Sequence, residues 1–540
     1  MTGSSRRHFL IAASSLVLLI VPALPFRLLC AEPAKVPNAA AEPPEVDILK
    51  QVQEINTGKF PQPATDFRQG HVTPRKLDPA IVQKTKDGFR IKLPSGAPVP
   101  TLTVHDGKLY ASGGFHSREF YCFNAATGEP IWAVDLDDDG PTSAVYGDGE
   151  IIFNTESCTI FSLDAETGKM LWSWFLGDPL MTTPTISGGR VYTSYPAAGR
   201  FAGQKLPEIE PAAKPAGQAA PKQSEKEQPA KTVPMPAPTH VLACFDLKTG
   251  KILWQRWIDS DVMSAPVAVD NDLYVASFSG TLYRFRQADG VILSAKQARA
   301  TSAPIVVGKD IFFTRRAEDS PAMKPEEAMV RGDRETSKVQ SEAVRKAAPH
   351  LDARVQAGGQ LSISGTVLDA SNGFAAGAPV AANAGAATFN IGKGSVSTLQ
   401  AHQGSRVLNV GNTNFSCIGD ELFCTDAVSC KVAWSMKLEG DMAKEGGALA
   451  APPAAAGGQI FLATLKGDVL QLEPGKKSIT HRYPVGTALR FQPTIQDGRI
   501  YVGTQDGQVV CIDTGDKKLT GWSTWGGNSA HTGIRGEPGK

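Results

Sequence analysis

One nine-residue motif recurs eight times along this 540-residue chain. Its clearest copy is DAETGKMLW at 164–172, in which a small polar residue comes first, Thr-Gly follows and Trp comes last. Similar copies begin at Asn124, Asp246 and Asp426, and degenerate copies begin at Arg286, Asp333, Glu473 and Asp513. A period of this length means that one supersecondary unit is reused, so the fold must be a repeat architecture.

The spacing of the copies is regular. Three of the steps, such as 124 to 164, are 40 residues long, and the others are 40 plus 7, 42 or 53 residues. A second marker keeps the same register: Pro266, Pro453 and Pro493 each stand 20 residues before a motif. Ala144 and Arg406 occupy this proline position in repeats two and six. The extra residues are therefore insertions into a constant unit.

Each unit reads as short strands separated by turns. Apolar residues alternate before the motif, as in Phe161-Ser162-Leu163, which is typical of a strand. The Asp-x-x-Thr-Gly run suits a tight turn, because Asp and Thr bond the local backbone and Gly accepts a left-handed conformation. Four short antiparallel strands in about 40 residues form a propeller blade. The sequence thus predicts an all-β protein, an eight-bladed β-propeller of four-stranded antiparallel blades with long loop insertions, over residues 85–520.

Such rings usually close by combining strands from both ends of the chain. Phe89 to Leu93 (FRIKL) stands just before the first repeat, where the Trp-bearing strand stands in the other units. We expect it to complete the last blade. Trp522 competes for this role, because it lies one residue past the Trp position of repeat eight.

The remaining segments are assigned by composition. Residues 32–84 are a lead-in with one short helix expected near Val46 to Ile55, and 521–540 form a C-terminal tail. The insertion 197–238 is rich in Pro, Ala, Lys, Gln and Glu, which predicts a disordered hairpin loop. The insertion 318–402 is first charged and then rich in Gly and Ala, although DRETSK at 333–338 still belongs to repeat five. We expect an excursion on one face, as a lid or a docking surface.

Residues 1–31 read as an export signal. Ser5-Arg6-Arg7-His8-Phe9-Leu10 before an apolar run resembles a twin-arginine signal, and an ordinary basic signal region is the alternative. Cleavage after Ala31 is expected, and an uncleaved anchor stays open, although the apolar run is short for a spanning helix. Leu29 before Cys30 fits a lipoprotein signal badly. The protein is therefore expected in the periplasm, with no integral membrane segment after cleavage.

Charge and cysteines exclude several classes. The net charge of +1 implies no nucleic-acid partner. Four of the eight cysteines (Cys122, Cys244, Cys424 and Cys511) share one position, two residues before a motif. Equivalent sites on different blades lie beyond disulfide reach, so buried free thiols are expected.

The repeat Trp and Thr-Gly resemble those of the PQQ-binding-like (quinoprotein alcohol dehydrogenase-like) β-propeller superfamily. The resemblance covers roughly residues 85–520 and includes PQQ-dependent dehydrogenases and the propeller lipoproteins of the outer-membrane barrel-assembly machinery. The segment WSTWGGNSAHTG, from Trp522 to Gly533, is similar to a Trp-Gly-Gly-Asn segment of bacterial members. The family resemblance as a whole implies the propeller fold strongly and the function only weakly.

A PQQ-dependent dehydrogenase of this group needs an aspartate base, Ca²⁺ ligands such as Glu and Asn, and a Trp floor, and alcohol-oxidising members add vicinal cysteines. The sequence has no Cys-Cys pair and no matching Glu, Asn and Asp set at the channel positions. The repeat tryptophans Trp132, Trp172, Trp254 and Trp434 have a fixed register, so we interpret them as docking residues between blades. No cofactor is expected; PQQ and Ca²⁺ belong only to the alternative function.

Two groups are weak candidates for binding. Arg406, Arg490 and Phe491 are channel-mouth candidates for an anion or an acidic peptide, and Arg406 could equally pair with a nearby carboxylate. The run Asp137-Asp138-Asp139 could bind a cation, but such runs are more often solvated loops. His105 and His116 are expected at the surface, and no histidine pair has metal-ligand spacing.

The sequence favours an exported, non-catalytic propeller that acts as a scaffold or binding protein of the cell envelope, with envelope proteins as partners. A role in outer-membrane protein assembly rests on the family resemblance. The alternative is a PQQ-dependent alcohol or sugar oxidoreductase with a divergent site. A carbohydrate- or polymer-binding module is a third candidate.

Overall fold

The computed structural model describes residues 46–59, 61–156, 159–177, 182–197, 238–316, 327–345, 354–356, 360–363, 366–369, 407–441, 449–521, 524 and 526–532. These residues lie in one compact unit. The predicted export signal 1–31, Arg406, Trp522 and most of both insertions lie outside the described residues.

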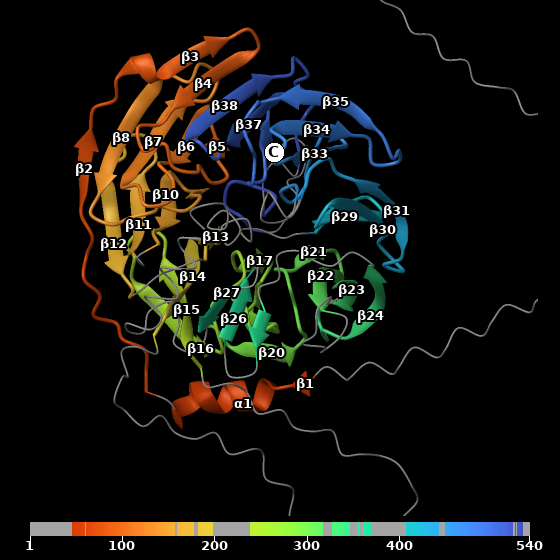
Figure 1. The fold of residues 1–540 in the computed structure, drawn as a ribbon. Coiled ribbons are helices and arrows are strands. Elements are labelled where there is room, and N and C mark those ends of the chain that lie inside the picture. Colours follow the sequence, from red (N-terminus) through yellow and green to blue (C-terminus); the bar gives the residue numbers. More distant parts are fainter. Residues whose placement is uncertain are drawn as a thin grey trace, which may run out of the picture. The chain divides into compact units, whose positions relative to one another are not determined.

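Eight antiparallel sheets form the blades of a β-propeller, as the repeats predict (Figure 1). The first strand of each blade lies innermost, and the Trp-bearing strand is the fourth. Blades 1 to 4 consist of β5 (Thr103–His105), β6 (Lys108–Ser112), β7 (Glu119–Asn124) and β8 (Pro130–Leu136); β9 (Val145–Gly147), β10 (Glu150–Asn154), β11 (Thr159–Asp164) and β12 (Met170–Phe175); β13 (Thr185–Ser187), β14 (Arg190–Pro196), β15 (His240–Asp246) and β16 (Ile252–Ile258); and β17 (Val267–Val269), β18 (Asp272–Ala276), β19 (Thr281–Arg286) and β20 (Ile292–Gln297).

Blades 5 to 8 follow the same order. They consist of β21 (Ile305–Val307), β22 (Asp310–Arg316), β23 (Glu327–Asp333) and β24 (Val339–Arg345); β28 (Leu408–Val410), β29 (Thr413–Ile418), β30 (Glu421–Asp426) and β31 (Val432–Lys437); β32 (Ala454–Ala456), β33 (Gln459–Ala463), β34 (Asp468–Leu472) and β35 (Ile479–Pro484); and β36 (Thr494–Gln496), β37 (Arg499–Gly503), β38 (Gln508–Asp513) and β4 (Gly88–Lys92).

The last blade combines strands from both ends of the ring. Strand β4 pairs with β38 and places Phe89 opposite Cys511, just as Trp132 lies opposite Cys122. The prediction that FRIKL completes the last blade is confirmed. Strands β36 and β5 lie side by side, so blade 8 meets blade 1 and the ring is closed.

Three blades carry a fifth strand that the repeat pattern does not predict. Strands β1 (Val46–Asp47), β2 (Val72–Arg75) and β3 (Val82–Thr85) pair with the fourth strands β20, β8 and β4. The expected short helix is present as α1 (Leu49–Glu54), followed by a π-helical turn (Ile55–Lys59), and a 3-10 turn (Pro79–Ile81) precedes β3.

Residues 46–85, which we call the belt, run along the outer rim past blades 4, 3, 2, 1 and 8 (Figure 1). The belt bonds blade 3 through Asn56 and Trp257, and blade 2 through Arg68 and Phe175. It therefore covers strand edges that would otherwise face water, a common protection of sheet edges.

The insertion predicted at 318–402 is divided by blade 5. Strands β23 and β24 lie within it as the outer half of that blade, with DRETSK as their connecting turn. Beyond them, β25 (Arg354–Gln356), β26 (Gln360–Ile363) and β27 (Thr366–Asp369) form a separate three-stranded sheet.

Three of the repeat tryptophans pack across the joint between neighbouring blades. The indole N–H groups of Trp132, Trp172 and Trp254 donate to the backbone carbonyls of Ala165, Leu247 and Gln287 in the next blade, at 3.0, 2.8 and 3.0 Å. The Thr-Gly turn of that next blade lies on the indole face: a Cβ on Gly168 would come within 2.7 Å of Trp132. Trp434 is half-buried beside Phe415, with the ring centres 5.9 Å apart.

The six cysteines among the described residues are buried and free, which confirms the expectation for the four that share one position, Cys122, Cys244, Cys424 and Cys511. Burial raises the pKa of the Cys122, Cys244 and Cys511 thiols to about 12. They are therefore protonated, small apolar groups at ordinary pH.

Candidate functional site

The two faces of the ring differ in what their loops carry. Turns that join first to second and third to fourth strands lie on one face, which we call the turn face. Loops that join second to third strands, and one blade to the next, lie on the insertion face. Residues 198–237, 317–326 and 346–406 all leave from the insertion face, because they follow β14, β22 and β24. The described turns of the turn face are short.

The positions near the axis form joints between blades. Thr103 donates from its hydroxyl to the carbonyl of Ala144 at 2.6 Å, and Thr185 does the same to Pro266 at 2.6 Å. Thr494 closes the series by donating to Leu102 at 2.6 Å. The accepting carbonyls belong to the small and apolar residues of the proline position. These bonds hold the first strands of neighbouring blades together.

Of the predicted channel-mouth residues, the structure describes Arg490 and Phe491. Arg406 lies outside the described residues. Phe491 is only 2% exposed, so a ligand could not reach its ring without rearrangement. Arg490 is partly exposed.

The C-terminal tail crosses the turn face near the axis. The N–H groups of Tyr146 and Ile186, in the first strands of blades 2 and 3, donate to the carbonyls of Ser529 and Ala530 at 2.7 and 3.0 Å. Thr494 in blade 8 lies 3.2 Å from the Thr524 hydroxyl. A cavity of about 300 Å³ separates the tail from the turns of blades 8 and 1, and its lining includes His105, Gln496, Asp497 and Asn528. His105, which was expected at the surface, is half-buried and stacks on Tyr146, with the ring centres 3.7 Å apart.

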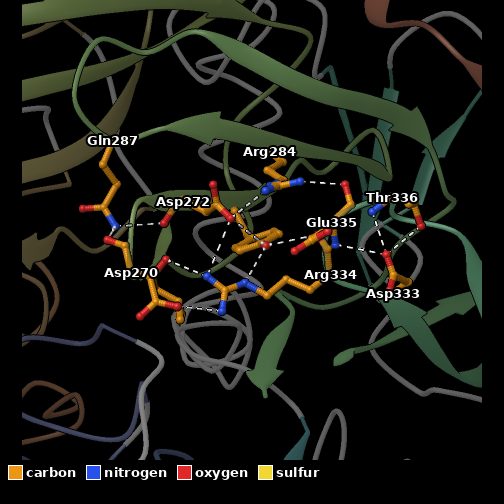
Figure 2. Close-up of polar contacts among 10 residues, drawn as sticks. Asp270, Asp272, Arg284, Gln287, Asp333, Arg334, Glu335 and Thr336 are labelled. Carbon is orange, nitrogen blue, oxygen red and sulfur yellow. Dashed lines mark hydrogen bonds and ion pairs between the residues drawn. The ribbon is translucent and has the colours of Figure 1, made fainter. Parts of the chain in front are cut away.

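A second cavity, of about 370 Å³, opens between blades 4 and 5 on the turn face and is charged (Figure 2). Arg334 bonds Asp270 at 2.7 Å and approaches Asp272 at 3.6 Å. Arg284 bonds Asp272 at 2.9 Å and donates to the carbonyl of Glu335 at 2.6 Å. Figure 2 shows these guanidinium and carboxylate groups pointing toward one another.

This charged cleft replaces a tryptophan joint. The Trp position of blade 4 is Ser294, and the residue paired with it is Arg284, where blades 1 and 3 have Cys122 and Cys244. Blades 1 and 3 have a large apolar ring beside a small thiol, whereas blade 4 has the small hydroxyl of Ser294 beside the long cationic side chain of Arg284. The ion pairs then balance the buried charge. The cleft is therefore a polar joint between blades.

A buried polar cluster lies on the insertion face where 198–237 leaves the ring. Asp261 accepts from the hydroxyls of Thr182 and Ser194, both at 2.7 Å. Asp259 and His240 are each 2% exposed; burial raises the pKa of Asp259 and lowers that of His240. Among the described residues, no group of three His, Cys, Asp or Glu side chains is placed to hold a metal ion.

The predicted carboxylate run is tied to its neighbours. Asp138 accepts from the hydroxyls of Thr155, at 2.7 Å, and Thr159, and Asp139 pairs with Arg118 at 2.5 Å. Beside it, burial raises the pKa of Glu156 to about 8, and His116 lies 2.7 Å away. The run is part of a hydrogen-bonded loop rather than freely solvated.

Comparison with known proteins now decides the family. The sequence profile described as outer membrane protein assembly factor BamB matches residues 92–204, 229–406 and 390–521. These ranges cover well over half of the chain. The chain belongs to this family.

Three solved structures similar to this BamB-family chain are distant from it in sequence. BamB from Moraxella catarrhalis is 14% identical, with a TM-score of 0.49, over 80% of this chain and 100% of that one. Quinohemoprotein alcohol dehydrogenase from Comamonas testosteroni is 13% identical, with a TM-score of 0.49, over 80% and 77%. Sqt1 from Saccharomyces cerevisiae is 8% identical, with a TM-score of 0.48, over 77% and 96%. The search of curated proteins found no match.

The groups through which this family member could hold PQQ with Ca²⁺ are its tryptophans and its buried carboxylates. Trp132, Trp172 and Trp254 lie in blade joints with their N–H groups bonded to backbone, not across the axis. Asp259 Oδ2 accepts from the Thr281 hydroxyl and Asp261 Oδ1 from the Thr182 hydroxyl, whereas Asp259 Oδ1 and Asp261 Oδ2 are buried without a hydrogen-bond partner. No described helix has the length and hydropathy of a membrane span.

Proposed function

We propose that this protein is an exported, non-catalytic β-propeller scaffold of the cell envelope that takes part in outer-membrane protein assembly. The observation that carries the proposal is the match of the BamB-family profile to three long ranges of the ring. The twin-arginine-like N-terminus supports export to the periplasm, since that route carries folded proteins and a ring must fold with both ends present.

The structure supports a binding role in two ways. The charged cleft between blades 4 and 5 has its cations paired with carboxylates, as suits a structural joint (Figure 2). All long insertions leave from one face of a rigid ring. Such a division, with loops on a rigid scaffold, is usual for proteins that bind other proteins.

The proposal predicts a loss of outer-membrane barrel proteins when the gene is deleted. The measurement is the amount of heat-modifiable, folded barrel protein in the outer membrane, with the wild-type gene restored as the control. Partners should be captured from the envelope by the full-length protein and lost when residues 346–406 are replaced by a short Gly-Ser linker. Replacement of residues 198–237 is the matched control. Unchanged barrel proteins in the deletion strain would contradict the proposal.

The oxidoreductase alternative has its own test. Purified protein is mixed with PQQ and Ca²⁺, and quinone absorbance and dye-linked alcohol oxidation are recorded. A scaffold is expected to show neither. Stoichiometric PQQ binding with turnover would replace the scaffold proposal by the alternative.

A further inference from the structure

The C-terminal tail is bound by backbone N–H groups of the ring that point toward the axis. Tyr146 and Ile186 are the middle residues of the first strands β9 and β13, which belong to neighbouring blades. The N–H of Tyr146 donates to the carbonyl of Ser529 at 2.7 Å, and that of Ile186 donates to the carbonyl of the next tail residue at 3.0 Å. Two neighbouring first strands therefore bind two consecutive carbonyl oxygens without using a side chain of the ring.

Among the described residues, the corresponding N–H groups of blades 8 and 1 have no such partner. They belong to Ile495 and Val104, the middle residues of the first strands β36 and β5, which lie side by side. In an antiparallel pair, residues that bond each other alternate with residues whose backbone groups point away. The first strands of blades 1, 2, 3 and 8 all reach the second strand through a turn of two residues, so their middle residues point the same way. In the described part of the chain, neither Val104 nor Ile495 donates its N–H to another segment.

Both residues line the cavity of about 300 Å³ that lies between the tail and blades 8 and 1. The lining also includes Gln496, Asp497 and Thr520. Gln496 is half-buried, and Asp497 and Thr520 are exposed. Two backbone donors thus lie at the same cavity as an amide, a carboxylate and a hydroxyl side chain.

The charges around this cavity disfavour an anionic ligand. Among the described residues, its lining contains one carboxylate, Asp497, and no lysine or arginine. Burial lowers the pKa of His105, which also lines the cavity, so this imidazole is neutral at ordinary pH. A carboxylate or phosphate would be repelled by Asp497 without a cation to balance it. A neutral carbonyl oxygen avoids this repulsion, and carbonyl oxygens are what the equivalent N–H groups of blades 2 and 3 bind.

We propose that this cavity binds a small neutral amide, whose oxygens accept from the N–H groups of Val104 and Ile495. The cavity volume lies at the lower end of the range for ligand pockets, which suits an N-acetylated sugar or an acetylated amino-acid amide. Hydroxyl or N–H groups of the same ligand then have Asp497 and Gln496 as partners. The site lies on the turn face, opposite the insertions, and it does not depend on the proposed scaffold function.

The test uses the full-length protein and four probes that differ in amide content and charge. N-acetylglucosamine and N-acetylalanine amide are the two neutral amides, and the tighter of them identifies the source of the ligand. Glucose lacks the amide, and N-acetylglycine adds a carboxylate to it. Binding is followed through the NMR shifts of the Val104 and Ile495 amides. The amide of Ala268, the middle residue of β17 in blade 4, is the control.

At least one neutral amide should bind saturably and shift the Val104 and Ile495 signals but not that of Ala268. Glucose and N-acetylglycine should bind about ten-fold more weakly or less tightly still, as expected for the loss of one hydrogen bond or for the added charge. Equal binding of glucose and the amides would overturn the proposal. So would the absence of any shift at Val104 and Ile495 with both neutral amides.

Two variants locate the site. Gln496→Trp places an indole at the cavity from the third residue of β36 and should weaken binding by about ten-fold or more. Val307→Trp, at the third residue of β21 and 37% exposed, is the matched control and should change it less than about two-fold. Both are checked for wild-type melting. Equal losses in the two variants would place binding elsewhere and refute the site.

A third variant tests the role of charge without filling the cavity. Asp497→Asn removes the carboxylate from an exposed turn, so N-acetylglycine should then bind about as tightly as the neutral amides. Unchanged discrimination against N-acetylglycine in this variant would contradict the assignment of a neutral ligand to this cavity.

Discussion

At the scale of single residues, the size of the side chain on one side of a blade joint is matched to the size on the other side. Where the Trp position holds Trp132, Trp172 or Trp254, the facing turn of the next blade has Gly, as with Trp172 and Gly250. Where it holds Ser294 or Ser341, the facing turn has Ser337 or Cys430, both at positive φ (53° and 60°). The missing indole leaves room for the side chain of Ser337 or Cys430. The positive φ strains the backbone of these residues, but the joint has space for their side chains.

This exchange predicts effects of different size for two small substitutions. Gly168→Ala places a Cβ 2.7 Å from Trp132 at a φ of +70°, and we expect a loss of about 2–4 kcal/mol in the free energy of unfolding. Cys430→Gly relieves a positive φ and should change it by less than about 1 kcal/mol. Urea unfolding measures both. The effect of Gly168→Ala should shrink in a Trp132→Ser background; additive effects would contradict the clash.

The buried carboxyl Glu156 predicts a pH dependence. Burial raises its pKa to about 8 in the folded state, so the folded protein binds more protons than the unfolded one between about pH 4.5 and 8. Stability from this group is therefore lost as pH rises through that window. Glu156→Gln should raise the unfolding free energy at pH 8.5 relative to wild type by roughly 1–3 kcal/mol, and much less at pH 4.5. A pH-independent difference would contradict it.

At the scale of elements, the belt binds by backbone groups at separate points. In blade 3 the contact is a single amide, because Asn56 satisfies both outward groups of Trp257. Removing it leaves two backbone groups without their partner at a partly buried edge. Asn56→Ala should cost about 1–3 kcal/mol in unfolding free energy. Thr57→Ala, on an exposed turn, is the control. Equal melting temperatures for the two variants would show that water replaces the amide.

The strands of the ring could be predicted because one pattern is written eight times, and FRIKL could be placed because it stands in phase with it. The belt could not, since β1 has two residues, β2 contains Pro74, and the blade 3 contact is one side chain. None of these shows strand periodicity. The charged cleft was missed for another reason: Arg334 and Asp270 pair across a joint, and the loss of Trp at Ser294 was its only signal.

At the scale of the whole molecule, closure depends on one short strand. Phe89 lies against Gly128 as Trp132 lies against Gly168, with a Cβ distance of 2.7 Å in both. The side chain of Phe89 has no N–H to donate as an indole would. The Tyr501 hydroxyl donates instead to the Ala125 carbonyl, at 2.9 Å. The joint between blades 8 and 1 is thus built like the others from residues more than 370 positions apart.

Two truncations distinguish the role of the belt in covering the rim from the role of β4 in closing the ring. A chain that begins at Lys76 loses β1 and β2 but keeps β3 and β4, so it should fold as a monomer with a lower melting temperature. A chain that begins at Leu93 also loses β4, which leaves blade 8 with three strands and removes Phe89 from its joint. Burial of Phe89 alone is worth about 3–5 kcal/mol, a large part of the stability of most domains. The second chain should therefore show no cooperative melting and should associate through its open blades, as seen by calorimetry and sedimentation. A sharp transition in a monomer that begins at Leu93 would mean that another segment, such as that around Trp522, closes the ring.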